Sequence, residues 1–294
     1  MKLRRSVLYV PGNNQRALEK SHMLAVDCVV YDLEDSVSPQ AKDEARDCVL
    51  WALAQENAIG QERIVRINSL HSSWVEQDVA ILKQASVDAV LLPKVTSVDD
   101  IHNYRKLFGP QSTYSPALWL MAETAAAVLN LSAIAAADPA VRVVMMGLED
   151  LTMETQIKQT PDREGLLYAL SACVMAARAG GLQIIDGVYT SLDDDAGFLN
   201  ECTQAKKLGF DGKSLIHPRQ VDVCNRCFSP TEEEVLWASE IVAVWEAKAT
   251  AGHSVVVVNG RMVEHLHVIE ARRILALANI VVEHPVLQGD IYRP

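Results

Sequence analysis

The feature that most constrains the fold of this 294-residue chain is an eightfold alternation of short apolar segments with helical segments. The apolar segments have the length of strands and occupy residues 6–10, 28–34, 63–68, 89–94, 117–123, 141–147, 182–188 and 210–218. The stretches between them, such as AKDEARDCVLWALAQ, place apolar residues at helical spacing. Eight alternations favour a closed parallel (β/α)8 barrel over an open doubly wound sheet. A chain of this length can form such a barrel as one domain.

Chemically active side chains follow nearly every predicted strand. They are Asp32 and Glu34, Arg66 and Asn68, Lys94, Glu123, Glu149 and Asp150, Asp186 and His217. In a parallel barrel the carboxyl ends of all strands converge on one face, where the loops build the active site. One acidic strand end alone is also explained by solvated carboxylates that cap helices. Acids and bases at so many strand ends predict a catalytic site at that face.

The last quarter of the chain has a different pattern, which is surplus to a finished barrel. A helical segment precedes two apolar runs, and Asn259 and Gly260 separate these runs as a two-residue hairpin turn would. A helix from about Leu266 is expected to follow. We therefore expect a barrel over residues 1–228 and a ββα-like extension over residues 229–294. The extension could be a cap, a dimerisation arm or a lid.

Charge and hydropathy narrow the class of protein. The formal charge of -11 argues against broad binding to nucleic acids or anionic membranes, although a local basic cluster can still hold one phosphorylated ligand. Pro11 and Gly12 interrupt the first apolar run before it reaches the length of a signal-peptide core, and no apolar stretch is long enough to span a bilayer. We expect a cytosolic protein.

The six cysteines are typical of scattered reduced thiols, and the CxxC of Cys224 and Cys227 lacks a second pair to complete a structural zinc site.

Glu123 and Asp150 are the best candidate pair of metal ligands, because each follows a very apolar strand. Two carboxylates brought together repel each other unless a cation or a proton lies between them, and hard oxygen ligands suit Mg²⁺. Helix N-capping explains acids at these positions equally well. Arg66 also ends a strand, where it could contact a carboxylate or thioester oxygen of a ligand or form an ion pair with one of the nearby acids.

Four basic residues form two pairs, each with a spacing of one helical turn: Arg16 with Lys20, and Lys42 with Arg46. Together they could hold phosphate groups, whereas each one singly is typical of a solvated surface. The sequence contains no Walker, GxGxxG, HExxH or GxSxG motif. The sequence therefore lacks the motifs that indicate nucleotide hydrolysis, Rossmann dinucleotide binding, zinc-protease chemistry or serine-hydrolase chemistry.

Several motifs taken together resemble one family. They are LRRSVLYVPGN, VVYDLEDSV, IVRINS, LLPKV, AETAAAVLN, MMGLEDL, IIDGVY and LGFDGKSLIHPRQV, and they span essentially the whole chain. The set resembles the citrate lyase β-subunit-like acyl-CoA lyases, which include malyl-CoA and citramalyl-CoA lyases, and the pattern is most similar to the latter. The resemblance implies a modified (β/α)8 TIM barrel that assembles as a homotrimer.

The resemblance also implies roles for individual residues. Glu123 and Asp150 would hold Mg²⁺, Asp32 and Glu34 would hold metal-bound waters, and Arg66 would contact the acyl portion of an acyl-CoA substrate. The coenzyme A site would be lined by Tyr9, Arg16, Lys20, Lys42, Arg46 and the backbone around Ile216 and His217.

In citramalyl-CoA lyases the C-terminal segment acts as a lid that reaches a neighbouring subunit, where it supplies a catalytic aspartate from a motif similar to GRMVE. The corresponding residue here is Glu264, whose side chain is one methylene longer, and misplacement by about one ångström can lower a rate roughly a hundredfold. The implied reaction is Mg²⁺-dependent cleavage of a 3-hydroxyacyl-CoA to acetyl-CoA and a 2-oxo acid. Arg66 would stabilise the enolate and Glu264 would exchange a proton.

Three alternatives remain open at this point. The chain could be the β subunit of a citrate lyase that acts on a carrier-bound acyl group, a non-catalytic protein that binds coenzyme A, or a condensing enzyme similar to malate synthase. Hydrolysis of the thioester after cleavage is also compatible with the sequence. The basic residues near the N-terminus favour free coenzyme A over an acyl carrier, because a carrier brings its own docking surface.

Overall fold

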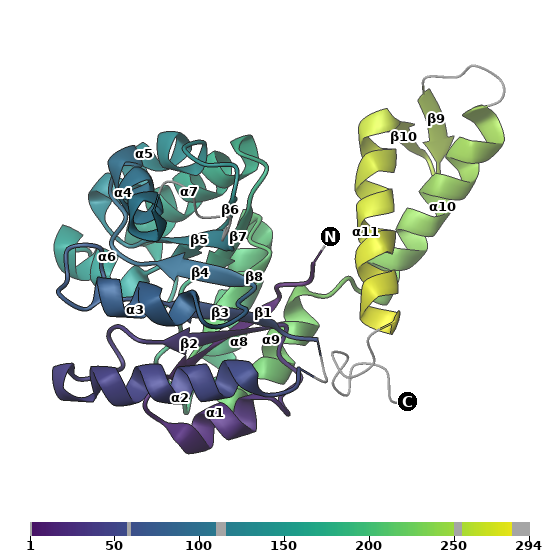
Figure 1. Ribbon diagram of the computed structural model, residues 1–294. Coiled ribbons are helices and arrows are strands. Elements are labelled where there is room, and N and C mark those ends of the chain that lie inside the picture. The colour runs from purple at the N-terminus through teal and green to yellow at the C-terminus, as the bar shows by residue number, and fades with distance from the viewer. Residues whose placement is uncertain (1, 58–59, 110–115, 250–254, 284–294) are drawn as a thin grey trace. The chain divides into compact units, whose positions relative to one another are not determined.

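The structure is a computed structural model that describes residues 2–57, 60–109, 116–249 and 255–283. The chain divides into two compact units: the larger is Arg4–Cys227, and the smaller combines Met1–Leu3 with Phe228–Pro294. Figure 1 shows both units. No helix in the described ranges combines the length and the apolar character needed to cross a membrane.

Eight parallel strands of the larger unit close into a barrel in sequence order, and β8 pairs with β1. The strands are β1 (Ser6–Pro11), β2 (Cys28–Asp32), β3 (Glu62–Arg66), β4 (Ala89–Leu92), β5 (Ala117–Ala122), β6 (Val141–Met146), β7 (Gln183–Asp186) and β8 (Gly212–Leu215). This closed barrel confirms the predicted fold class. Each strand lies within its predicted segment or exceeds it by one residue. Most strands end early, because the polar residues at their carboxyl ends belong to the loops.

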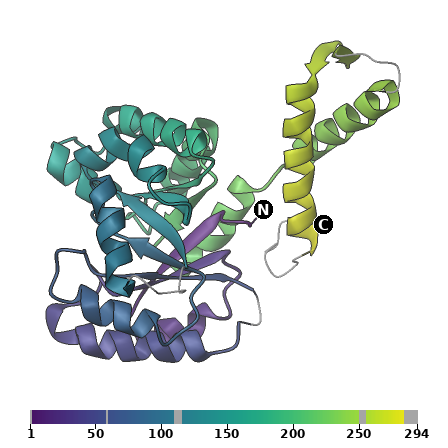
Figure 2. The same cartoon turned by 45° about the horizontal axis from the view of Figure 1, so that its top comes forward.

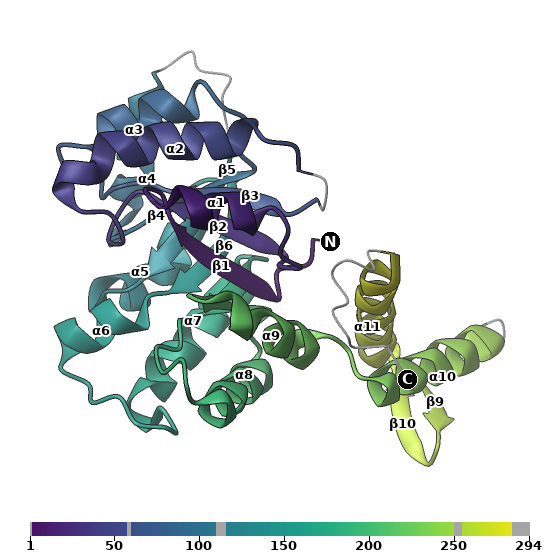
Figure 3. The same ribbon diagram turned by 90° about the horizontal axis from the view of Figure 1, so that it is seen from below.

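Helices cover the outside of the barrel, as Figures 2 and 3 show. They are α1 (Gln15–Ser21), α2 (Lys42–Ala54), α3 (Val75–Leu82), α4 (Val98–Phe108), α5 (Ala125–Ala135), α7 (Leu167–Ala179), α8 (Asp195–Leu208) and α9 (Val221–Phe228). Short 3₁₀ helices lie at Pro39–Ala41, Glu164–Leu166 and Pro218–Gln220. An additional helix, α6 (Leu148–Thr155), stands between β6 and α7. It modifies the regular alternation and carries Asp150 in its first turn.

The barrel interior is filled in layers, because alternate residues of each strand point inward. Its apolar layers consist of Val7, Cys28, Val30, Ile64, Ala89, Leu91, Trp119, Met121, Val143, Met145 and Ile185. At the amino-terminal end, Arg4 donates to both carboxylate oxygens of Glu62, at 2.7 and 2.9 Å, and lies over the Trp119 ring. At the opposite end the same alternation brings Asp32 and Arg66 to inward positions of β2 and β3, where they are partners in register. Strand periodicity thus places charge at the mouth of the barrel.

The C-terminal unit contains α10 (Glu232–Ala249), β9 (Val255–Val258), β10 (Arg261–Glu264) and α11 (His265–Glu283). The strands form an antiparallel hairpin, and Asn259 and Gly260 have φ angles of 47° and 76°, which confirms the predicted two-residue turn. Helices α10 and α11 pack side by side (Figure 1). The unit buries its own core of Ala238, Ile241, Val256, Val258, Val263, Val268, Ala271 and Ile274.

Candidate active site

Arg66 is the central cation at the mouth of the barrel. Its Nε and Nη2 donate to the two carboxylate oxygens of Asp32 at 2.6 and 2.7 Å, and its guanidinium lies over the Tyr9 ring at 4.8 Å. Its Nη1 lies 3.2 Å from Glu34 Oε2. The interpretation of Arg66 as an ion-pair partner of neighbouring acids is confirmed. Contact with an acyl group remains a prediction.

The pKa values of Asp32 and Glu34 are shifted in opposite directions although the two residues are two positions apart. Burial opposes ionisation of Asp32, but the charge and hydrogen bonds of Arg66 outweigh it and hold the pKa of Asp32 below its usual range. Backbone N–H groups of Glu34 and Ser36 also donate to Asp32. Burial raises the pKa of Glu34 to about 8, against the opposing effect of Arg66. Asp32 is therefore a fixed anion that orients Arg66, whereas Glu34 can gain or lose a proton near neutral pH.

Lys94 brings Glu123 and Asp150 together. The N–H of Lys94 donates to Glu123 Oε1 at 2.5 Å, and its Nζ lies 3.8 Å from the same oxygen and 2.6 Å from Asp150 Oδ1. The two residues predicted as metal ligands therefore share one cationic neighbour. From the sequence, Lys94 is only a base at a strand end with no predicted role, because nothing in the sequence shows which acids it meets.

Helix capping does not account for Glu123. The residue that caps α5 is Thr124, whose hydroxyl accepts from the N–H of Ala127 at 3.0 Å. Asp150 lies in the first turn of α6, where the N-cap residue Gly147 offers no side-chain bond. The alternative interpretation as a helix cap is thus wrong for Glu123.

The surroundings of Glu123 fit a hard divalent cation. Its side chain is fully buried, and its Oε2 has no hydrogen-bond partner among the residues that the structure describes. Gly147 makes room for this carboxylate, since a Cβ atom on Gly147 would lie 2.7 Å from Oε2. Burial raises the pKa of Glu123 to about 7, although Lys94 opposes the shift. An unpartnered carboxylate oxygen close to Asp150 is a donor set that suits Mg²⁺.

The candidate site offers only two carboxylates among the described residues, and two are enough to bind Mg²⁺. Within the described ranges, no group of three or more His, Cys, Asp or Glu side chains could hold a metal. Mg²⁺ usually keeps several waters and uses one or two protein carboxylates, so that a substrate can replace the waters. A cavity of about 540 Å³ adjoins Asp150 and is lined by Asp35, Glu149, Asp150, Thr152, Met153 and Ile157. This cavity provides space for a ligand beside Asp150.

A family model described as HpcH/HpaI aldolase/citrate lyase matches residues 5–218, which is nearly the whole barrel unit. The chain belongs to this family. The resemblance inferred from the motifs is therefore confirmed. A (3S)-malyl-CoA thioesterase of Cereibacter sphaeroides is 40% identical over 277 residues, covering 94% of this chain and 95% of the relative. The citrate lyase subunit beta of Escherichia coli K12 is 35% identical over 286 residues, covering 94% of each chain.

Solved structures of the family share the fold. The protein CitE from Mycobacterium tuberculosis, in complex with magnesium, acetoacetate and coenzyme A, superposes with a TM-score of 0.77 at 26% identity and covers 93% of this chain and 97% of its own. A citrate lyase from Burkholderia xenovorans LB400 has a TM-score of 0.81 at 20% identity and covers 98% of this chain and 97% of its own. The second similarity concerns the fold alone.

Lys42 and Arg46, two basic residues that the family resemblance places in the coenzyme A site, are buried and have internal partners. Lys42 Nζ donates to two backbone carbonyls that follow β2, at 2.7 and 2.8 Å, and to Asn68 Oδ1 at 2.6 Å. Arg46 Nε donates to Asp78 Oδ1 at 2.8 Å. Their interpretation as solvated surface residues is therefore wrong. A contact with phosphate remains a prediction, and for Lys42 it would require the loss of an internal bond.

Four of the five remaining residues predicted to bind coenzyme A are accessible, whereas the fifth, Tyr9, is partly buried against the core of the barrel. Arg16 and Lys20 are exposed on one face of α1. Ile216 and His217 follow β8 and are also exposed, but their N–H groups already donate to Gln220 Oε1, at 3.0 and 3.3 Å. Among these four, the side chains of Arg16 and Lys20 are better placed than the backbone of Ile216 and His217 to meet a phosphate.

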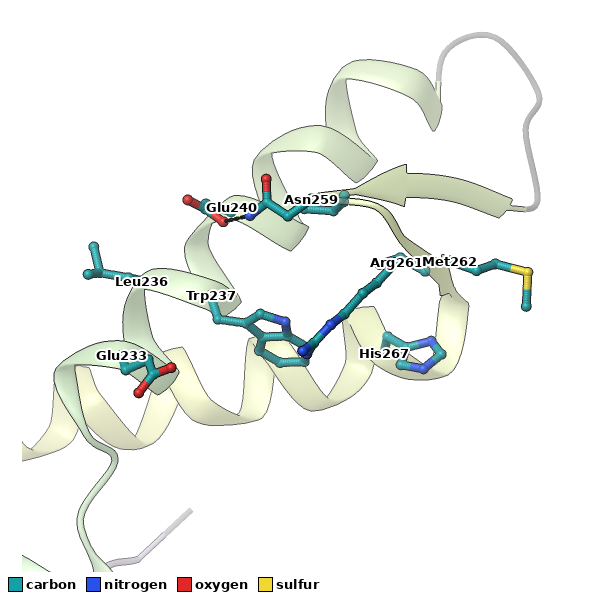
Figure 4. A pocket seen from close by; sticks show the side chains of 10 residues that line it. Glu233, Leu236, Trp237, Glu240, Asn259, Arg261, Met262 and His267 are labelled. Carbon is teal, nitrogen blue, oxygen red and sulfur yellow. Dashed lines mark hydrogen bonds between the residues drawn. The ribbon is translucent and has the colours of Figure 1, made fainter.

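Glu264 lies at the end of β10 in the C-terminal unit, whereas the other predicted site residues belong to Arg4–Cys227. Its N–H donates to Nδ1 of His267 at 3.0 Å, so that His267 fixes the backbone at the start of α11. Trp237, Arg261 and His267 are among the residues that line a pocket of about 540 Å³ in this unit (Figure 4). A catalytic role for Glu264 remains a prediction.

A buried charged cluster between the barrel and α8 was not predicted. Lys213 Nζ donates to Asp186 at 2.7 Å and to Glu201 at 2.8 Å, and Arg163 Nη1 donates to both oxygens of Asp186. Asp186 and Lys213 are fully buried. Asp186 therefore ends its strand without pointing into the mouth, because the inward position of β7 belongs to Ile185. The cluster joins β7 and β8 to α8.

Proposed function

We propose that this protein is a Mg²⁺-dependent carbon–carbon lyase that cleaves a 3-hydroxyacyl-CoA of the malyl-CoA or citramalyl-CoA type. The products would be acetyl-CoA and a 2-oxo acid. The observation that carries the proposal is the meeting of Glu123 and Asp150 at the mouth of the barrel, where one buried oxygen of Glu123 has no hydrogen-bond partner within the described ranges. The complex of M. tuberculosis CitE with magnesium, acetoacetate and coenzyme A supports both the ion and the class of ligand.

The residues at the mouth can divide the chemistry among them. Glu123 and Asp150 would hold Mg²⁺, which when bound supplies a Lewis acid for the oxo-acid half of the substrate. Cleavage of the carbon–carbon bond moves negative charge onto the thioester oxygen, and Arg66 would stabilise it. Asp32 keeps Arg66 oriented through two short hydrogen bonds, so this positive charge is in place before the reaction begins.

The assembly of the site is also part of the proposal. Glu264 would give a proton to the carbon that becomes the acetyl methyl group, or take one from it in the reverse direction. The C-terminal unit would act as a lid that brings Glu264 to the barrel of a neighbouring subunit in a homotrimer. Arg16 and Lys20 would meet the phosphates of free coenzyme A, and the enzyme would work in the cytosol.

Thioester hydrolysis is the second candidate function, because the C. sphaeroides relative at 40% identity is a (3S)-malyl-CoA thioesterase. The two reactions break different bonds. A lyase breaks a carbon–carbon bond and leaves the thioester intact, whereas a thioesterase releases the coenzyme A thiol and leaves the hydroxy acid whole. The metal and the coenzyme A site would be common to both.

The products of the purified protein distinguish these functions. We would incubate it with Mg²⁺ and malyl-CoA, methylmalyl-CoA or citramalyl-CoA, and identify products by mass spectrometry. A shorter acyl-CoA plus a 2-oxo acid supports the lyase, and free coenzyme A plus the intact hydroxy acid supports the thioesterase. Binding without turnover across the panel would contradict both and support a non-catalytic protein. Activity only with an acyl carrier protein would support a citrate lyase β subunit.

The affinity for Mg²⁺ is expected to fall as the pH decreases from about 8 to about 6. Burial raises the pKa of Glu123 to about 7 and that of Glu34 to about 8, so both carboxyls take up protons across this range. Only the ionised carboxylate binds the metal, and binding must therefore release protons at the acid end. Isothermal titration calorimetry in two buffers of different ionisation enthalpy measures both effects. A constant Kd without proton release would show that the Glu123 carboxylate does not bind the ion.

A further inference from the structure

Lys94 has a backbone conformation that a lysine rarely adopts. Its φ angle is 53°, in the left-handed region, and it follows Pro93 directly at the end of β4. Residues held in this region are strained and persist only where the surrounding structure enforces them, and they cluster at functional sites. Here the enforcing contact is the bond from the Lys94 N–H to Glu123 Oε1. The main chain of Lys94 thus bonds Glu123, while its ammonium lies between Glu123 and Asp150 and closer to Asp150.

We propose that the Lys94 ammonium is a built-in substitute for the divalent cation, which neutralises Glu123 and Asp150 when the metal is absent and is displaced when the metal binds. This inference rests on the metal site of the proposed function. Without a cation, the buried carboxylate of Glu123 would face Asp150 unbalanced, and such a pair of acids repels. The Nζ atom lies 2.6 Å from Asp150 Oδ1 and 3.8 Å from Glu123 Oε1, as a shared counterion should.

Displacement follows from the geometry. A metal held by Glu123 and Asp150 would use the carboxylates that the ammonium now neutralises, and two cations in that space repel each other. The Lys94 side chain is 31% exposed, so its flexible stem has solvent into which it can move. The N–H of Lys94 can stay on Glu123 Oε1 during this exchange, while Oε2 has no competing partner in the described part of the chain.

The exchange would couple the binding of the metal to the binding of the substrate. In the protein without ligands, the metal has to compete with a tethered ammonium, which lowers its affinity. The carboxylate of a bound substrate offers the displaced ammonium a new partner, so metal and substrate would bind together more readily than the metal alone. Lys94 would thus be a positioning residue that holds the acids in place and tunes metal affinity.

The decisive experiment measures the affinity for Mg²⁺ alone, without substrate, by isothermal titration calorimetry at about pH 8.5, where the carboxyls are largely ionised. Lys94→Met removes the charge and shortens the side chain by only one heavy atom, and we expect the Kd for Mg²⁺ to fall at least about tenfold. Lys94→Arg keeps the charge and should bind Mg²⁺ about as weakly as the natural protein. Lys83→Met removes an exposed lysine next to α3 and should change nothing.

Equal or weaker Mg²⁺ binding by a folded Lys94→Met protein would overturn the inference while leaving the proposed function intact. Failure of the natural protein to bind Mg²⁺ at all would instead overturn the metal site itself. If Lys94→Met does not fold, Lys94→Asn replaces it, because asparagine tolerates the left-handed backbone and carries no charge. The same fall in Kd is expected for that variant, and an unchanged Kd counts against the inference.

Discussion

Glu123→Gln is expected to reduce Mg²⁺-dependent turnover at least about a thousandfold, which corresponds to a loss of about 4 kcal/mol of transition-state stabilisation. The amide has the volume of the carboxylate and can still accept the N–H of Lys94, so the barrel should remain folded. What disappears is the negative oxygen that is available for the ion, because no other described residue forms a hydrogen bond with it. Steady-state kinetics give kcat and KM, and calorimetry gives the Kd for Mg²⁺.

The matched control for this variant is Glu76→Gln, which changes an exposed acid in the first turn of α3 by the same atoms. It should leave both turnover and metal affinity unchanged. Should Glu123→Gln retain full Mg²⁺-dependent activity, Glu123 would not be a metal ligand. A variant that binds Mg²⁺ normally but does not turn over would move Glu123 from metal binding to another role in the reaction.

Lys213→Met is expected to lower the free energy of unfolding by about 3–5 kcal/mol, because it removes one partner of a buried ion pair and leaves excess negative charge out of water. Lys213 is fully buried between Asp186 and Glu201, and with Arg163 the four residues balance two positive against two negative charges. Urea denaturation at neutral pH, followed by circular dichroism, measures the loss.

Two further variants test the cause of this effect. Lys207→Met removes an exposed lysine from α8 and should shift stability by less than about 0.5 kcal/mol. Adding Glu201→Gln to Lys213→Met restores the charge balance and should recover part of the loss. A double variant no more stable than Lys213→Met would mean that packing, and not charge, accounts for the effect.

The parts of the molecule that follow a periodic pattern were predictable from the sequence. Short continuous runs of apolar residues define the strands, and the side-chain period of two along a strand explains why Asp32 follows Val30 into the barrel interior and meets Arg66 at the mouth. The hairpin in the C-terminal unit was predictable for a similar reason, because Asn259 and Gly260 readily adopt positive φ angles. In each case the signal lies within a few neighbouring residues.

The parts that depend on distant partners were not predictable. The charge of Lys42 predicts a side chain exposed to solvent. Its ammonium is nevertheless buried, because carbonyl groups after β2 and the amide of Asn68 surround it. The role of Lys94 depends on the positions of Glu123 and Asp150, which belong to the segments after two later strands. A single sequence carries the identities of such residues, but their partners are determined only when the barrel closes.

The ion pair of Arg4 and Glu62 has a consequence for the order of events in turnover. With this pair at the amino-terminal end and apolar side chains filling the interior, the described part of the barrel offers no route through its centre. Substrates would therefore enter, and products leave, through the same opening at the carboxyl-terminal end of the barrel. The fragment bound deeper in the site has to wait until the other has left, so the proposed lyase should release its products in a fixed sequence.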